Sequence, residues 1–131
     1  MSELLRDGLL VGIGGFFGAV ARFIVTRWLQ NIEESLPLGT LAVNILGSLT
    51  LAFLATMLSQ RFFPNSSFRL IMMVGFLGAF TTFSAFSYES VLLWSSGRWL
   101  ASAANIVLSI GTCFSATALG IAIGRQMSVS P

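Results

Sequence analysis

Polar side chains recur at helical spacing inside long apolar segments of this sequence. Asn44 lies in the middle of one segment, and another carries, at every fourth position, Asn105, Ser109, Cys113 and Thr117. That spacing places the four side chains on one face of a helix. Polar groups buried in an apolar medium are costly and need partners. A line of hydroxyl and amide donors suits a small, strongly hydrated anion, although the same groups can also hold helices together.

Aromatic rings form a second pattern in residues 75–87. Phe76, Phe80, Phe83 and Phe86 follow one another at spacings of four, three and three. The edge of an aromatic ring is electropositive, so an anion can approach it edge-on. The same spacing is also typical of a stripe that faces lipid or the protein core, and the residues alone leave both interpretations open.

The same segment contains residues that are poorly suited to an unbroken helix: Gly75, Gly78 and the pair Thr81–Thr82. A helix interrupted at membrane depth leaves backbone groups unpaired, which is tolerated only inside protein or beside a cavity holding water or ions. Interrupted helices in transporters place backbone carbonyls on cations. A continuous helix whose small residues serve packing is the alternative.

Membrane-spanning helices must position these residues. The chain has 131 residues, of which 55% are hydrophobic and 9% charged, whereas soluble domains carry about 25% charged residues. A spanning helix needs about 20 mostly apolar residues. Charges and turn formers divide the chain into four such segments. We therefore predict an all-α membrane protein with a single domain over residues 1–131 and spans near 8–29, 36–60, 68–94 and 98–124.

Composition also excludes several classes of function. The seven basic residues are all arginine and are scattered singly, which does not favour nucleic-acid binding. The chain lacks histidine, and Cys113 is its only cysteine, so we predict neither an enzyme nor a cysteine-based metal centre. Arg22 is the cation most deeply placed within a predicted span. We expect it to reach an interface, to pair with Glu89 or a carbonyl, or to line a vestibule.

The arginines give a weak signal for orientation. Four predicted spans put both ends of the chain on one side of the membrane. That side would hold Arg6, Arg61, Arg69 and Arg125, and the other side would hold Arg27 and Arg98. The difference points to termini in the cytoplasm. So small a difference also suits a protein that inserts in both orientations.

Three segments resemble motifs of the CrcB/Fluc family of fluoride channels. Residues 14–23, GGFFGAVARF, resemble that family's GGxxGAxxRY. Residues 39–48, GTLAVNILGS, resemble its GTLxVNxxGxF, and residues 75–86, GFLGAFTTFSAF, resemble its GFxGGxTTFSTF. The motifs fall on three successive predicted spans in the family's order, and the chain length fits throughout.

The resemblance implies an antiparallel, dual-topology homodimer in the cytoplasmic membrane, with the third helix broken mid-membrane. It implies passive, selective efflux of fluoride through two pores. It also implies a structural sodium ion at the dimer centre, held by the backbone carbonyls of Gly78 and Thr81. The residues we place on the fluoride path are Asn44, Thr82, Phe83, Ser84, Phe86, Asn105 and Ser109, with Arg22 at the vestibule.

The sequence departs from the family pattern at several positions, and parts of it also fit other functions. Ala79, Ala85 and Asn105 stand where family members often have other residues, and Ala85 removes a hydroxyl. The alternative function is a small proton-coupled multidrug exporter, which needs a carboxylate deep in the membrane, and Glu89 is the only candidate. A scaffolding subunit would account for the GxxxG pairs, which let helices pack closely. These pairs are Gly8/Gly12, Gly14/Gly18 and Gly120/Gly124.

Overall fold

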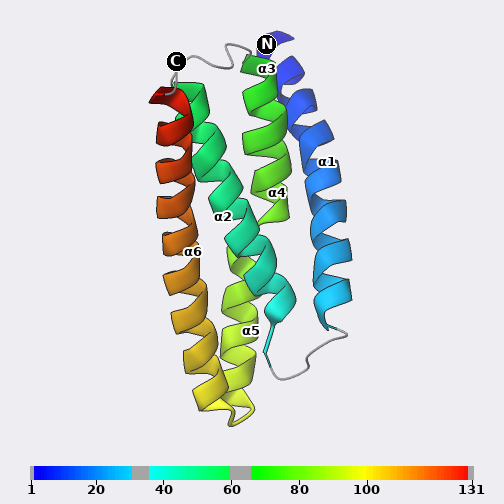
Figure 1. Ribbon diagram of the computed structural model, residues 1–131. Coiled ribbons are helices and arrows are strands. Elements are labelled where there is room, and N and C mark those ends of the chain that lie inside the picture. The colour runs from blue at the N-terminus through cyan, green and yellow to red at the C-terminus, as the bar shows by residue number, and fades with distance from the viewer. Residues whose placement is uncertain (1, 31–35, 60–65, 130–131) are drawn as a thin grey trace.

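The computed structural model describes residues 2–30, 36–59 and 66–129, without the side chains of Ser59, Ser128 and Val129. The described elements, all helical, are α1 (Ser2–Gln30), α2 (Leu38–Ser59), α3 (Ser66–Arg69), the π-helix η1 (Leu70–Leu77), α4 (Gly78–Phe80), α5 (Phe83–Ser95) and α6 (Trp99–Val129) (Figure 1). Residue 60, the predicted end of the second span, lies outside the described residues.

Four stretches of the described chain are long and apolar enough to cross a membrane. They are Ser2–Gln30, Leu38–Leu58, Ser66–Ser95 and Trp99–Met127, and each overlaps one predicted span. The third stretch runs through α3, η1, α4 and α5. The start of α1 and the end of α6 lie at the same end of the bundle (Figure 1). The predicted all-helical, four-span architecture is therefore confirmed.

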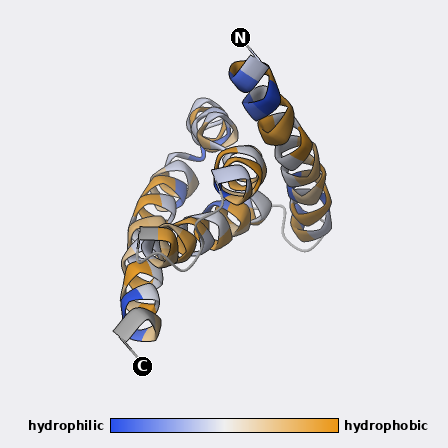
Figure 2. Cartoon of the chain, turned by 90° about the horizontal axis from the view of Figure 1, so that it is seen from above, coloured by the Kyte–Doolittle hydropathy of each residue, from blue (hydrophilic) through white to orange (hydrophobic). Residues whose placement is uncertain are grey.

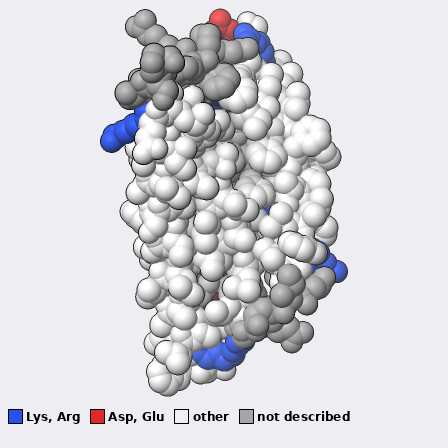
Figure 3. Space-filling model, viewed as in Figure 1, with Lys and Arg blue, Asp and Glu red and all other residues white. Residues whose placement is uncertain are grey.

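Apolar side chains cover the outside of the bundle. Hydrophobic residues occur all round the helices in the view from above (Figure 2), and Phe16 and Phe114 expose 65% and 75% of their surface. The visible basic side chains, in contrast, gather mainly toward the two ends of the molecule (Figure 3). Large continuous apolar surfaces are rare on soluble monomers. This distribution fits a protein whose middle is surrounded by lipid.

Glycines let α1 approach the first half of the third span. A side-chain carbon added at Gly14 would overlap the carbonyl of Ile71, and one added at Gly18 would overlap the carbonyl of Phe76. This pair therefore packs α1 directly against the backbone of η1, as small-residue pairs do between membrane helices. Of the other two predicted pairs, Gly120/Gly124 packs against α2, whereas Gly8/Gly12 has nothing within 4 Å.

The third span is interrupted near its middle. α4 ends at Phe80 and α5 begins at Phe83. Between them, Thr81 (φ −82°, ψ 156°) and Thr82 (φ −152°, ψ 114°) adopt extended conformations, which β-branched residues readily accept. Gly75 and Gly78 are helical, so the break that the sequence predicted falls on the threonine pair.

Candidate functional site

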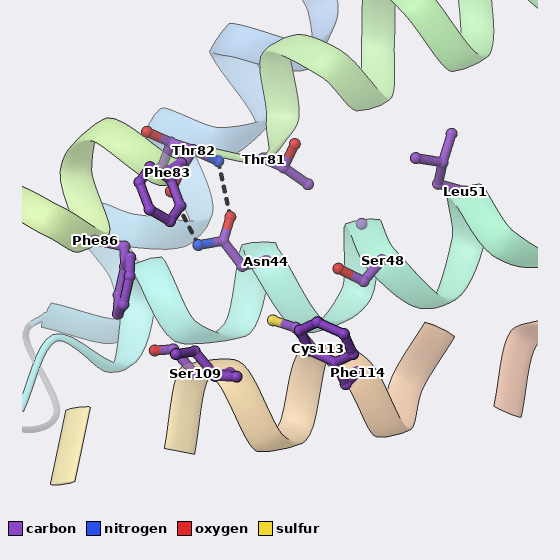
Figure 4. A pocket seen from close by; sticks show the side chains of 12 residues that line it. Asn44, Ser48, Leu51, Thr81, Thr82, Phe83, Phe86, Ser109, Cys113 and Phe114 are labelled. Carbon is purple, nitrogen blue, oxygen red and sulfur yellow. Dashed lines mark hydrogen bonds between the residues drawn. The ribbon is translucent and has the colours of Figure 1, made fainter. Parts of the chain in front are cut away.

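A pocket of about 300 Å³ lies beside the break. Its walls come from α2, α6, the threonine pair and the start of α5 (Figure 4). The residues that line it are Asn44, Gly47, Ser48, Leu51, Thr81, Thr82, Phe83, Phe86, Ser109, Ile110, Cys113 and Phe114. None of these side chains carries a formal charge at neutral pH.

The amide of Asn44 binds both backbone groups of Thr82 and so gives the Thr82 N–H a partner in place of the one lost at the break. Its Oδ1 accepts the backbone N–H of Thr82 at 2.7 Å, and its Nδ2 donates to the Thr82 carbonyl at 3.0 Å (Figure 4). Breaking a buried hydrogen bond while leaving one partner unsatisfied costs about 1–3 kcal/mol. An amide nitrogen carries two protons, and this pair of bonds uses one of them. Asn44 therefore holds the break in place and still has a second N–H for another acceptor.

Four carbonyls at the break lose their usual helical donors, and those of Gly78 and Thr81 are the first and last of them. In a continuous helix, Gly78 O would accept from the N–H of Thr82, and Thr81 O would accept from the N–H of Ala85. Here the Thr82 N–H donates to Asn44, and the Ala85 N–H donates to Thr82 Oγ1 at 3.1 Å. Gly78 and Thr81, whose carbonyls lose these two donors, are the residues predicted to bind a cation through their carbonyls.

Arg22 reaches this region from α1. Its Nη1 lies 3.5 Å from the carbonyl oxygen of Thr81, at the limit of a hydrogen bond. The side chain is half-buried and does not line the pocket. Of the partners expected for Arg22, a backbone carbonyl is thus the one that lies within its reach in the single protomer.

The four-phenylalanine stripe separates into two pairs. The ring centroids of Phe83 and Phe86 lie 5.4 Å apart with planes at 57°, and both rings line the pocket. Phe83 is 78% exposed whereas Phe86 is 8% exposed. Phe76 and Phe80 stack on each other at 5.8 Å, and neither lines the pocket. The break between Phe80 and Phe83 is what separates the pairs.

The remaining predicted path residues divide between the pocket and its surroundings. Thr82 and Ser109 line the pocket. Ser84 is exposed and does not line it, although its Oγ lies 3.1 Å from Thr82 Oγ1. Asn105 is buried away from the pocket and donates to Ser90 Oγ at 2.9 Å. The pocket thus brings together five of the seven predicted path residues.

Sequence reasoning missed several apolar and small lining residues. Leu51, Ile110 and Phe114 carry no distinguishing signal, because apolar side chains are ordinary in a membrane span. Gly47 had one available signal, since it lies one helical turn after Asn44. A side-chain carbon at Gly47 would overlap Thr81 Cγ2, so glycine is required for α2 to approach the break this closely.

Glu89 lies on α5 and does not line the pocket. Its Oε1 accepts a hydrogen bond from Thr40 Oγ1 at 2.7 Å. Its Oε2 is buried, with no hydrogen-bond partner among the described residues. The carboxylate that the exporter alternative requires is therefore held against α2, outside the pocket.

Comparison with known proteins identifies the family. The pattern of the family described as "CrcB-like protein, Camphor Resistance (CrcB)" matches residues 9–121. A relative from a Nitratiruptor species is 43% identical over 118 residues, which cover 89% of this chain and 91% of the relative. A relative from a Sulfurovum species is 40% identical over 91% of this chain and 94% of its own. Both relatives are named "Fluoride-specific ion channel FluC". With the three motifs lying on the first three of its four spans, this chain belongs to the CrcB family.

Proposed function

We propose that this protein is a fluoride-selective ion channel that carries fluoride passively out of the cell across the cytoplasmic membrane. The observation that carries the proposal is the uncharged pocket at the helix break, where the Asn44 amide meets the rings of Phe83 and Phe86. Conduction requires sites that bind an ion strongly enough to admit it and weakly enough to release it. The names of the relatives support the choice of fluoride.

Fluoride would exchange water for protein donors along this path. Two kinds of group can contact a small anion here. The hydrogen-bond donors are the second N–H of Asn44 and the hydroxyls of Thr82 and Ser109. The electropositive ring edges are those of Phe83 and Phe86. A narrow path of this kind would exclude chloride, which is larger. Arg22 would raise the local concentration of anions at the vestibule. Direct contact of fluoride with Ser84 and Asn105, which lie off the pocket, stays a prediction.

A second copy of the chain would complete the path. Phe83 and Phe114 line the pocket, yet they are 78% and 75% exposed in the single protomer. One protomer therefore encloses the pocket from one side. The near balance of arginines between the two ends supports a partner in the opposite orientation, and we include an antiparallel, dual-topology homodimer in the proposal.

The proposal also includes a structural sodium ion at the dimer interface. The donors that fit it are the carbonyls of Gly78 and Thr81, whose helical partners are diverted at the break, and the exposed position of Gly78 makes its backbone accessible to a second copy. Among the described residues, no group of three or more acidic, cysteine or histidine side chains could hold a metal. Sodium bound there would be coordinated by the negative ends of the carbonyl dipoles at the break in each copy.

Fluoride flux from liposomes tests the proposed function. Purified protein in potassium fluoride liposomes should release fluoride rapidly once a potassium ionophore removes the opposing voltage. Potassium chloride liposomes should release almost no chloride, because the proposed path, completed by the second copy, would be too narrow for the larger anion. An ion-selective electrode measures both rates. Equal rates for the two anions, or a fluoride rate no higher than in protein-free liposomes, would refute the function.

Replacing sodium tests the assembly. Dialysis against N-methyl-D-glucamine, a cation too large for the carbonyl site, should lower both the dimer fraction and the fluoride flux, and added sodium should restore them. Native mass spectrometry measures the dimer fraction. The orientation in the membrane is measured in a Cys113→Ser background, by labelling a single cysteine introduced by Ser96→Cys from either side of the membrane. A conducting monomer, or labelling from one side only, would contradict the dual-topology dimer.

A further inference from the structure

We infer that Asn105 is a positioning residue that fixes the Phe86 ring at the pocket by acting through Ser90. The inference rests on the proposed function for its meaning in transport, because Phe86 lines the proposed fluoride path. In this role Asn105 does not need to contact the fluoride ion.

The first step is the pair of hydrogen bonds that meet at the Ser90 hydroxyl. Asn105 Nδ2 donates to Ser90 Oγ at 2.9 Å, and Ser90 Oγ donates to the Phe86 carbonyl at 2.8 Å. A hydroxyl has a single proton. Because the Asn105 amide acts as donor, the Ser90 proton stays directed at the backbone of Phe86. The three groups therefore form an oriented chain from α6 to the residue that carries the pocket ring.

The second step is the attachment of the Ser90 backbone to the same face of α6. Ser102 Oγ donates to the Ser90 carbonyl at 2.8 Å, and residues three apart share a helix face. Ser90, Ser102 and Asn105 are 5%, 2% and 4% exposed. Water cannot replace a hydrogen bond broken at such a site, so each bond constrains position strongly.

Other hydrogen bonds among the described residues hold α5 on either side of Phe86. The first turn of α5 is held by the bonds between Asn44 and Thr82, and Thr40 holds Glu89 on the side facing α2. The bonds from α6 to Ser90 set how close α5 lies to α6, where Ser109 forms the facing wall of the pocket. Loss of the Asn105 bond would let α5 and the Phe86 ring shift relative to that wall.

The experiment combines flux with a signal from the ring itself. Asn105→Leu keeps the side-chain size and removes the donor, and Ser90→Ala removes the hydroxyl that links Asn105 to Phe86. Each should lower fluoride flux about tenfold, and the double variant should be no worse than either single one, because the residues act as a unit. Ser115→Ala is the matched control, since this exposed α6 hydroxyl donates to Gly111 O of its own helix.

Fluorine NMR of 4-fluorophenylalanine at position 86 supplies the second readout. Its resonance should shift or broaden in Asn105→Leu and in Ser90→Ala, and it should remain unchanged in Ser115→Ala. The resonance of a label at position 76 should not change in any of these variants. Reduced flux in Asn105→Leu with an unchanged ring signal would overturn the inference, because Asn105 would then act on the ion directly. An unchanged ring signal in Ser90→Ala would also overturn it. The ring signal needs no transport, so the inference can be judged even if the protein does not conduct fluoride.

Discussion

Asn44→Asp is expected to abolish fluoride flux while the protein remains folded. The aspartate can still accept the Thr82 N–H, but it cannot donate to the Thr82 carbonyl and it adds a negative charge to the pocket. Two like charges about 4 Å apart repel by about 4 kcal/mol at an effective dielectric constant of about 20. Since each 1.4 kcal/mol changes a rate about tenfold, we expect a loss of about 100-fold or more. Liposome efflux measures it.

A second substitution at the same position separates charge from structure. Asn44→Leu has a similar volume and no charge, but it removes both hydrogen bonds to Thr82 and leaves the Thr82 N–H without a partner. Fluoride efflux should therefore be slow, and the melting temperature in thermal unfolding should fall. Thr50→Val, at an exposed position of α2 outside the pocket, is the control and should behave as wild type in both assays. Wild-type flux in a dimeric Asn44→Asp protein would show that Asn44 is not on the fluoride path.

Phe83→Ile and Phe86→Ile are each expected to reduce flux by about two- to tenfold. Each change removes an electropositive ring edge from the pocket and breaks the contact between the two rings. A pair of aromatic rings is worth about 0.5–1.5 kcal/mol beyond its buried area. Phe86→Ile also removes buried volume, so its melting temperature should fall, whereas exposed Phe83 should tolerate the change in a single protomer.

Phe76→Ile is the matched control for the ring substitutions. Phe76 stacks on Phe80 outside the pocket, so its loss should affect stability more than flux. Fluoride efflux and thermal unfolding, measured on the same three variants, distinguish the two effects. If Phe76→Ile blocks flux while the changes at positions 83 and 86 leave it intact, the pocket beside the break is not the conduction path.

The sequence alone determined the architecture because the signals for it are local. An apolar segment of about 20 residues can satisfy its backbone in lipid only as a helix, which made the four spans predictable. Gly75, Gly78 and the threonine pair indicated an interruption in the third span, although these residues alone also allowed a continuous helix. Asn44 stood out for a similar reason, because a lone amide among apolar neighbours must find a partner.

Only the tertiary structure decided which partners those residues found. Asn44 and Thr82 are far apart in the chain, and the local sequence around either residue does not predict that the Asn44 amide binds both backbone groups of Thr82. Helical spacing alone does not distinguish Phe83 from Phe80, and only the family resemblance assigned Phe83 to the path. In the structure Phe83 lines the pocket, whereas Phe80 stacks on Phe76. Asn105 shares a helix face with Ser109, yet it lies nearer the α5–α6 turn and meets Ser90 on α5. Helical periodicity predicts a shared face, whereas the crossing of the neighbouring helix decides which residues of that face meet a pocket and which meet protein.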